Sequence, residues 1–275
     1  MISHEEGEGF TVLLSLYNKE STSALNSCLE SIYYQTIQAN EVVIVYDGVI
    51  SEGLDNVVHV WMDIMPIKVF KLCENKGLGY ALNFGLQYCT NELIARMDTD
   101  DVCLPKRFEK QLDIMKKDPD LSVVGAAIEE FDETMTSSLG IRFSRETHEN
   151  IVAYSKHRNP LNHMSVMFRK SHVQKVGGYQ EHFFMEDYNL WLRLMSNGYR
   201  FYNIKDVLLK VRAGDSMITR RRGTEYLKSE AYLLKMKIKL KIDTPLHAFC
   251  VFLLRFIPRL LPFFLLRVLY KLMRK

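Results

Sequence analysis

The run Glu92-Leu93-Ile94-Ala95-Arg96-Met97, followed at once by Asp98-Thr99-Asp100-Asp101, decides how this 275-residue chain is expected to fold. The first six residues predict a strand, and the acidic residues come where the extended pattern breaks into a loop. Two carboxylates spaced i, i+2 beyond a strand end can converge on a hard divalent ion such as Mg²⁺ or Mn²⁺, which prefers oxygen ligands. A solvated acidic loop is the plain alternative for this motif taken alone, so the surrounding sequence must decide.

Apolar strands alternate with helices around this motif. Strands are predicted at 10–16, 41–46, 66–72 and 93–97, with helical spacing of apolar residues after the first strand and over 77–88. This alternation favours an α/β fold with a mostly parallel sheet covered on both faces, which binds ligands beyond the carboxyl ends of its strands. Four polar residues fall at or just after such ends and should share one rim of the sheet: Tyr17, Asp47, Asn75 and Asp98.

The middle of the chain is less regular. Residues 105–115 predict a helix with a proline in its first turn, and residues 121–127 and 163–169 predict strands. A helix is expected at 186–195, where the acidic start complements the helix dipole, and a last strand at 207–211.

Composition indicates an ordinary globular protein, since 47% hydrophobic residues suffice for a large core. The five cysteines are odd in number and never form a CxxC pair, which argues against a disulfide framework and a zinc site and for a reducing, cytosolic compartment. The first nine residues lack the basic and apolar regions of a signal peptide.

Charge is divided unevenly along the chain. From Lys205 to the end there are 17 Lys/Arg against 5 Asp/Glu, whereas the part before it has 19 against 28. A basic tail of this kind suggests a separate partner, either nucleic acid or an anionic membrane surface. We therefore divide the chain into a domain over 1–215 and a tail over 216–275.

These features together resemble the family 2 glycosyltransferases, which have the GT-A fold, over about residues 10 to 215. The resemblance rests on motifs in a fixed order: Ser15-Leu16-Tyr17-Asn18, Tyr46-Asp47-Gly48, Asn75-x-Gly77-x-x-x-Ala81-x-Asn83-x-Gly85, Asp98-Thr99-Asp100-Asp101, and Glu186-Asp187 with Leu190-Trp191-x-Arg193. It implies a Rossmann-like, mostly parallel mixed sheet flanked by helices, and transfer of a sugar from a nucleotide donor.

The resemblance also implies a donor site. Tyr17 and Asp47 would hold the uracil of a UDP-sugar, with the Asp47 carboxylate accepting from the ring N–H. The Gly77-to-Gly85 segment would pass under the nucleotide, where glycine permits close approach, and Asn83 would lie near the ribose or sugar. Asn75 would also bind the donor. Many relatives carry an Asp directly before Asp47, where this chain has Tyr46.

For the chemistry, the resemblance places Asp98 and Asp100 at the diphosphate, with Asp100 as the more direct ligand of Mn²⁺ or Mg²⁺. Asp101 would face the sugars. Asp187 would be the base that deprotonates the acceptor hydroxyl in a single inverting displacement, and Glu186 would raise its pKa by like-charge repulsion. Taken alone, an acidic pair at a helix start is more often a cap.

Three further groups have an open role. His163 is expected either to bind the acceptor or the diphosphate, or to be structural. Trp191 is expected in the core, with stacking on an acceptor sugar as the alternative. Arg220, Arg221 and Arg222 are expected in a loop that either closes on the diphosphate or is simply solvated.

The tail from Leu246 to Lys275 is strongly apolar, yet its longest uncharged stretch has 11 residues, too few to span a bilayer. Pro258 and Pro262 divide it into two short helices, with Arg255 and Arg259 on or near the first. The pattern is typical of amphipathic helices lying in a membrane interface, and packing on the domain or in a dimer is the alternative.

With its tail, the chain resembles bacterial enzymes that build O-antigen or exopolysaccharide repeat units, including the amylovoran-type glycosyltransferases. This implies a hexose transferred from a UDP-sugar to a sugar on undecaprenyl diphosphate, by a cytoplasmic protein held peripherally on the inner face of the cytoplasmic membrane. No nucleic acid partner is expected, since apolar helix faces have no use on a phosphate backbone.

Two other classes of protein are alternatives to a glycosyltransferase. Asp98-Thr99-Asp100-Asp101-Val102 also fits the nucleophile loop of a haloacid-dehalogenase-type phosphatase, although that motif normally begins its domain. A non-enzymatic adaptor on a membrane surface would require the acidic rim residues to be accidental.

Overall fold

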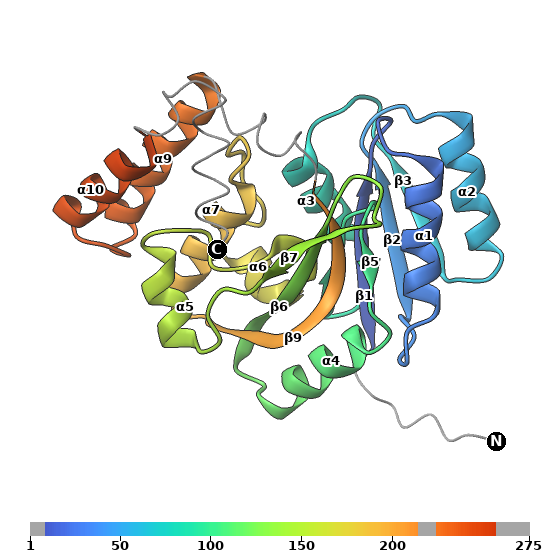
Figure 1. Cartoon of the computed structure of the whole chain (residues 1–275), viewed down its shortest axis with the longest axis horizontal. Helices are drawn as coiled ribbons and strands as arrows, with labels where there is room; N and C mark the ends of the chain where they lie inside the picture. Colours follow the sequence, from blue (N-terminus) through green and yellow to red (C-terminus); the bar gives the residue numbers. More distant parts are fainter. Residues whose placement is uncertain (1–8, 214–223, 257–275) are drawn as a thin grey trace.

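A nine-stranded mixed sheet forms the centre of the protein in a computed structural model that describes residues 9–213 and 224–256 (Figure 1). Strands pair in the order β3-β2-β1-β4-β8-β6-β9-β5, with β7 added beside β6. Pairing is parallel along β3-β2-β1-β4 and between β6 and β9, and antiparallel where β8 joins β4 to β6. The predicted mostly parallel mixed sheet is therefore confirmed.

The elements follow the expected alternation in the first hundred residues. The strands are β1 (Phe10–Leu16), β2 (Glu41–Tyr46), β3 (Ile67–Lys71), β4 (Leu93–Arg96), β5 (Val102–Cys103), β6 (Leu121–Phe131), β7 (Ser138–Arg142), β8 (Met167–Arg169) and β9 (Arg200–Arg212). The helices are α1 (Thr22–Tyr33), α2 (Glu52–Met62), α3 (Leu78–Tyr88), α4 (Arg107–Lys117), α5 (His148–Ser155), α6 (Lys170–Lys175), α7 (Glu186–Ser196), α9 (Thr224–Lys239) and α10 (Pro245–Phe256), with one 3₁₀ turn, η1 (His163–Ser165).

The segment 163–169 was predicted as one strand and is divided into η1 and β8. The Ser165 hydroxyl accepts from the Ala126 N–H at 3.0 Å and donates to the Asn162 carbonyl at 2.8 Å. The Ser165 side chain thus makes hydrogen bonds that the backbone of a continuous strand would otherwise make. Serine often interrupts a strand or helix in this way. Strands β6 and β9 are in turn longer than predicted.

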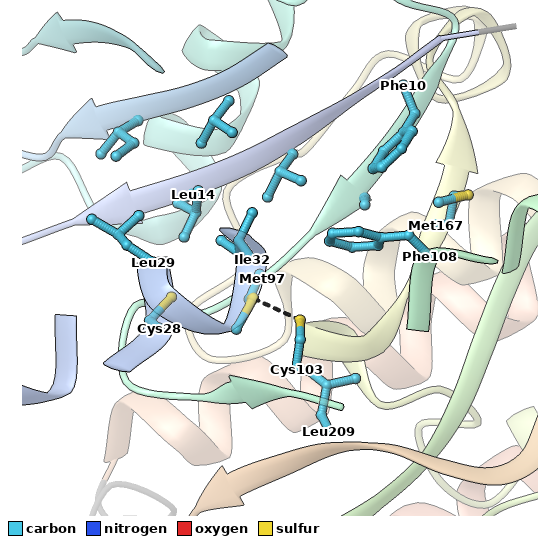
Figure 2. Packing of buried hydrophobic residues seen from close by; sticks show 14 of the residues in the cluster. Phe10, Leu14, Cys28, Leu29, Ile32, Met97, Cys103, Phe108, Met167 and Leu209 are labelled. Atoms are coloured by element: carbon cyan, nitrogen blue, oxygen red, sulfur yellow. Dashed lines mark hydrogen bonds between the residues drawn. The ribbon is translucent and has the colours of Figure 1, made fainter. Parts of the chain in front are cut away.

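Alternate residues of the central strands pack against helices on opposite faces. Val12 and Leu14 of β1 lie in one core cluster with α1, α2 and α4, whereas Leu13 lies in a second cluster with α3 and α7. Figure 2 shows the first cluster, where the rings of Phe10 and Phe108 lie 4.9 Å apart. Burial on both faces explains why these strands are apolar throughout.

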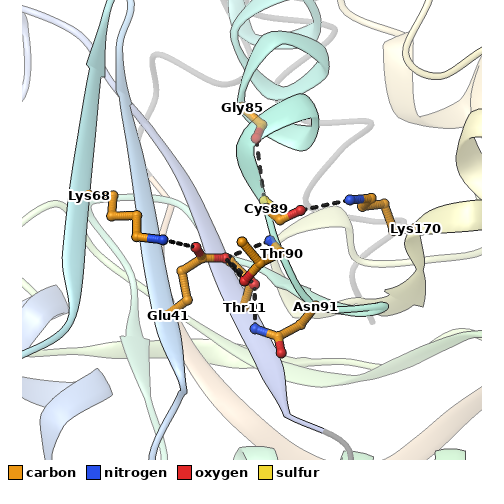
Figure 3. A network of polar contacts seen from close by, with 8 residues as sticks. All are labelled: Thr11, Glu41, Lys68, Gly85, Cys89, Thr90, Asn91 and Lys170. Carbon is orange, nitrogen blue, oxygen red and sulfur yellow. Dashed lines mark hydrogen bonds and ion pairs between the residues drawn. The ribbon is translucent and has the colours of Figure 1, made fainter.

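A buried carboxylate fixes the amino ends of the central strands. Glu41 accepts from the Thr11 hydroxyl at 2.7 Å, from the Lys68 ammonium at 2.8 Å and from the Thr90 N–H at 2.8 Å (Figure 3). Burial opposes the charge of Glu41, but these hydrogen bonds lower its pKa overall. The network joins β1, β2 and β3 to the turn between α3 and β4.

Helices α9 and α10 form a hairpin at the opposite end of the molecule from α2 (Figure 1). Leu233 and Tyr226 of α9 pack on Met185, Tyr188 and Leu192 at α7. Among the described residues, no helix is long and apolar enough to cross a membrane.

Replacing Glu41 by Gln keeps the shape of the side chain and removes its charge. We expect the free energy of unfolding at pH 7 to fall by about 1–3 kcal/mol, because three donors lose a charged acceptor. Since the pKa of Glu41 is lowered below 4.5 in the folded state, its contribution is complete above that pH and is lost as the pH falls through the folded pKa.

The measurement is urea unfolding of wild type and Glu41→Gln at several pH values, with the exposed Glu30→Gln as the matched control. A difference in stability that did not shrink at acidic pH would show that the charge of Glu41 is not what the network uses.

Candidate functional site

A single cavity of about 1150 Å³ lies beyond the carboxyl ends of β1, β2 and β4. Most of the residues predicted for the site line it, although they come from segments far apart in the sequence: Tyr17, Asp47, Asn75, Gly77, Asp98, Asp100, Asp101, His163 and Asp187. Glu186, Asn83 and Trp191 are not among its lining residues. The sheet topology thus brings the predicted donor, metal and base positions together.

The loop after β4 gathers three carboxylates. Asp98, Asp100 and Asp101 each place an oxygen within 4.8 Å of the other two. Burial raises the pKa of Asp100 to about 7, and the charges of Asp98 and Glu20 add to the rise. The pKa of Asp101 is also raised well above its usual range, by burial first and by the charges of Asp98 and Asp100 next. Bringing these groups together is therefore costly without a counter-charge.

The donor set fits a hard divalent cation. The Oδ1 atom of Asp101 accepts from the Arg212 N–H at 3.1 Å, while its buried Oδ2 has no hydrogen-bond partner among the described residues. A buried oxygen without a partner, beside two more carboxylates, matches the oxygen-only coordination of Mg²⁺ or Mn²⁺. Asp101 was expected to face the sugars, but the structure places it in the carboxylate cluster.

Arg96, at the end of β4, was not singled out from the sequence. Its guanidinium is fully buried and binds both carboxylate oxygens of Asp98 through two nitrogens. A signal for Arg96 was present in the sequence, since it is an arginine in an otherwise apolar strand and a buried charge requires a partner. Asp98 follows two residues later, which places both side chains on the same face of the strand. Arg96 fixes Asp98 and leaves Asp100 and Asp101 as the carboxylates without such a clamp.

Asp47 organises the loop that passes across the cavity. Its Oδ1 accepts from the Lys76 N–H at 2.7 Å and its Oδ2 from the Gly77 N–H at 3.0 Å. Gly48 has φ 90°, and a Cβ there would lie 2.7 Å from the Asn75 nitrogen, so glycine is required where the two loops touch. Asp47 was expected to accept from a uracil ring, whereas in the structure both of its oxygens bind backbone amides.

Asn83 lies on α3, one helical turn below the cavity. Its side-chain oxygen accepts from the Tyr179 N–H at 3.2 Å and lies against Gly178, which has φ 63°. Asn83 thus holds the Gly177-Gly178 turn, and its contact with the ribose or sugar stays a prediction.

Asp187, in the first turn of α7, also lines the cavity. Its Oδ2 accepts from the Asn159 amide at 2.5 Å and its Oδ1 from the Tyr188 N–H at 2.7 Å. Burial raises the pKa of Asp187, against the lowering effect of these two hydrogen bonds. A carboxylate with a raised pKa that is also oriented by an amide is suited to act as a base.

Glu186, the neighbour of Asp187, packs against α3, where a Cβ added at Gly79 would lie 2.9 Å from the Glu186 Cγ. Burial raises the pKa of Glu186 to about 7, and the Asp187 charge contributes. Burial is also the leading cause of the raised pKa of Asp187, and a contribution from the charge of Glu186 stays a prediction.

His163 and Trp191 have neighbouring rings, 6.0 Å apart, but only His163 lines the cavity. The His163 Nε2 lies 2.8 Å from the Tyr179 hydroxyl, and burial together with the Arg96 charge lowers its pKa well below the usual value, so the ring is neutral. His163 still lines the cavity. Trp191 is fully buried among core residues of the second cluster, which excludes stacking on an acceptor sugar.

The tail contributes to the wall of the cavity. Tyr226 of α9 and Leu254 and Arg255 of α10 line it. The Arg255 guanidinium binds the buried Glu230 carboxylate, at 2.7 Å from Nη2 to Oε1. Arg255 was expected at lipid headgroups, but it is the partner of Glu230 inside the hairpin. Arg220, Arg221, Arg222 and the second predicted tail helix lie outside the described residues.

Chemically, this cavity brings a cluster of three carboxylates that could hold a metal ion and the oriented carboxylate of Asp187 to one space. Comparison with known proteins agrees with that arrangement. The model for glycosyl transferase family 2 matches residues 11–177. The amylovoran biosynthesis glycosyltransferase AmsE of Erwinia amylovora is 47% identical over 97% of this chain and 99% of its own length. A UDP-Gal:α-D-GlcNAc-diphosphoundecaprenol β-1,3-galactosyltransferase of Escherichia coli is 40% identical over 80% of each chain.

Solved structures show the same fold at low sequence identity. Staphylococcus aureus TarS 1–349 in complex with UDP-GlcNAc has a TM-score of 0.69 at 16% identity, covering 91% of this chain and 72% of its own. The mannosyltransferase PcManGT of Pyrobaculum calidifontis, in complex with GDP-Man and Mn²⁺, has a TM-score of 0.63 at 17% identity, covering 88% and 69%. The chain belongs to glycosyl transferase family 2 and has the GT-A fold.

Proposed function

We propose that this protein is an inverting, metal-dependent glycosyltransferase that moves a hexose from a UDP-sugar to a sugar on a lipid diphosphate of the undecaprenyl type. The reaction would extend a repeat unit in O-antigen or exopolysaccharide synthesis, at the cytoplasmic face of the membrane. The observation that carries the proposal is one cavity lined both by three clustered carboxylates and by Asp187. The Escherichia coli relative, whose name states this substrate pair, supports it.

The carboxylate side suits the donor diphosphate. A divalent cation held by Asp100 and Asp101 would stabilise negative charge on the departing UDP, without a proton transfer. Asp98, held by Arg96, keeps the third carboxylate in place beside them. Tyr17, 39% exposed at the cavity, offers an aromatic face for the uracil, and the loop of Asn75 and Gly77 that Asp47 holds forms the floor.

The Asp187 side suits the acceptor. Asp187 would take the proton of the acceptor hydroxyl as that oxygen bonds to the anomeric carbon and the bond from that carbon to UDP breaks. If this base attacks from the face opposite the departing UDP, a single displacement inverts the anomeric centre and gives a β-linkage from an α-linked donor. Asn159 keeps one oxygen of Asp187 oriented during this step.

Substitution of Asp100 tests the metal. Mn²⁺ should raise the melting temperature of the wild-type protein, and EDTA should abolish its transfer activity. Asp100→Asn should fold, but it should be inactive in transfer and its melting temperature should not respond to Mn²⁺. Because Asp100 has a pKa of about 7, an ion must displace a proton below that pH, so stabilisation by Mn²⁺ should be weaker at pH 6 than at pH 8.

Thermal melting with and without Mn²⁺ measures this, and the exposed Asp120→Asn serves as the control that keeps wild-type behaviour. Full transfer activity of Asp100→Asn in EDTA would remove the metal from the mechanism.

Substitution of Asp187 by Asn tests the base. The shape and the position on α7 are kept while the proton acceptor is lost, so kcat should fall by on the order of 10² or more, with UDP affinity within a few-fold of wild type. Glu186→Gln should cost much less, because Glu186 packs on α3 outside the cavity lining. Loss of rate in Glu186→Gln with Asp187→Asn active would reverse the assignment.

Peripheral attachment to the membrane is proposed through α10. Leu246, Phe249 and Leu253 follow one another at helical spacing and are 76%, 48% and 37% exposed. Apolar side chains on one face of a helix, in a segment rich in Lys and Arg, are suited to the boundary between lipid headgroups and acyl chains.

The double variant Leu246→Gln with Phe249→Gln should bind anionic vesicles several-fold more weakly than wild type in a sedimentation assay. Wild-type binding should fall but persist as salt rises, because salt screens the cationic contribution and not the apolar one. Val60→Gln with Ile64→Gln, exposed at and just after α2 near the other end of the molecule, is the matched control (Figure 1). An equal loss of vesicle binding in both double variants would contradict a role for α10 in membrane attachment.

A further inference from the structure

The cavity is lined by charged residues of both signs. Glu20, Lys19, Arg212 and the carboxylate cluster line it near β1 and β4, where the Arg212 N–H binds Asp101. Arg142, Arg158 and Arg255 also line it, and we call this part of the wall its far end. Arg142 binds Glu130 and Arg255 binds Glu230, so both of these arginines are held in place by carboxylates. Three arginines in one wall favour an anionic ligand there.

Arg158 stands next to the base. It follows α5 and directly precedes Asn159, the residue whose amide binds Asp187. Arg158 is exposed and lines the same cavity as Asp187, so both side chains are available to one acceptor molecule. Arginine binds phosphate oxygens through two parallel N–H groups, which makes it the preferred cation for a diphosphate.

Apolar side chains stand beside these arginines. Phe184 and Leu254 both line the far end and are 40% and 74% exposed. Phe184 has φ 60°, a backbone conformation that a bulky residue rarely adopts, and its ring packs near those of Phe183 and Tyr226. Such strain is retained where the surrounding structure fixes a side chain for contact with a ligand.

We propose that the far end of the cavity is a subsite for a prenyl diphosphate, in which Arg158 binds the diphosphate and Phe184 and Leu254 contact the start of the lipid chain. The inference rests on the proposed function, since it concerns the acceptor of that reaction. With the acceptor hydroxyl at Asp187, the diphosphate on the anomeric carbon of the same sugar extends across the ring toward Arg158. The chain then leaves along α10, whose exposed face continues from Leu254 to Leu253 and Leu246.

Binding of farnesyl diphosphate to the full-length protein tests the subsite without the acceptor sugar. The titration is done with UDP and Mn²⁺ at saturation, so that the carboxylate end is filled. Wild type should still bind farnesyl diphosphate, and should bind inorganic pyrophosphate at least several-fold more weakly because pyrophosphate makes no apolar contact. Displacement of farnesyl diphosphate by UDP with Mn²⁺ would place it in the donor site and overturn the proposal.

Two variants separate the charged part of the subsite from its apolar part. Arg158→Gln should weaken farnesyl diphosphate binding about tenfold or more, since it removes a charge-assisted contact. Leu254→Gln should weaken it about threefold while leaving pyrophosphate binding unchanged. The controls are Arg145→Gln, an arginine that stacks on Tyr154 and is outside the cavity lining, and Val60→Gln on α2. If these two variants and the two controls all bound farnesyl diphosphate with equal affinity, the proposal would be overturned.

Transfer assays separate this inference from the function on which it rests. Wild type should prefer an acceptor with a diphosphate to the neutral glycoside of the same sugar, and Arg158→Gln should reduce that preference by raising the acceptor KM more than it lowers kcat. Equal use of both acceptors by wild type would keep glycosyl transfer and overturn the subsite. Absence of transfer to any acceptor would remove the proposed function, and the farnesyl diphosphate titration would still decide the subsite.

Discussion

Repulsion among Asp98, Asp100 and Asp101 is the constraint around which the site is built. The fold holds three carboxylate oxygens within 4.8 Å of one another, and two of the groups respond with raised pKa values. Such a cluster costs stability unless positive charge compensates it. Arg96 provides part of that positive charge, because its guanidinium binds the Asp98 carboxylate. The remaining demand for charge on the cavity side suits a divalent cation and the donor diphosphate that it would neutralise.

The same buried arginine connects both sides of the cavity. Arg96 clamps Asp98, and its charge also acts on His163, which it helps to keep neutral, and on Asp187, whose pKa it lowers against the effect of burial. One cation at the end of β4 therefore influences the carboxylate cluster, Asp187 and His163. This arrangement keeps the two sides of the cavity chemically distinct although they share one space.

The tail takes part in the site more directly than an anchor would. Helix α9 packs on α7, and the ion pair of Arg255 with Glu230 ties α10 to α9. Because Leu254 and Arg255 line the cavity, any contact of α10 with a membrane would bring that surface to the acceptor side of the site. Attachment and acceptor binding would then be two uses of the same helix, the first through Leu246 and Phe249 and the second through Leu254.

The sequence by itself determined the alternation of strands and helices and the polar residues at strand ends, because both depend on local periodicity and on the parallel order of β1, β2 and β4. It therefore placed Tyr17, Asp47, Asn75 and the Asp98-to-Asp101 loop on one rim, as the cavity confirms. Only the tertiary structure decided which of these side chains remain available to a ligand. Asp47, Asn83 and Arg255 are polar residues whose groups bind other parts of the chain, and those partners lie from 25 to 96 residues away. A hydrogen bond over such a distance is set by how the layers pack, which no local pattern records.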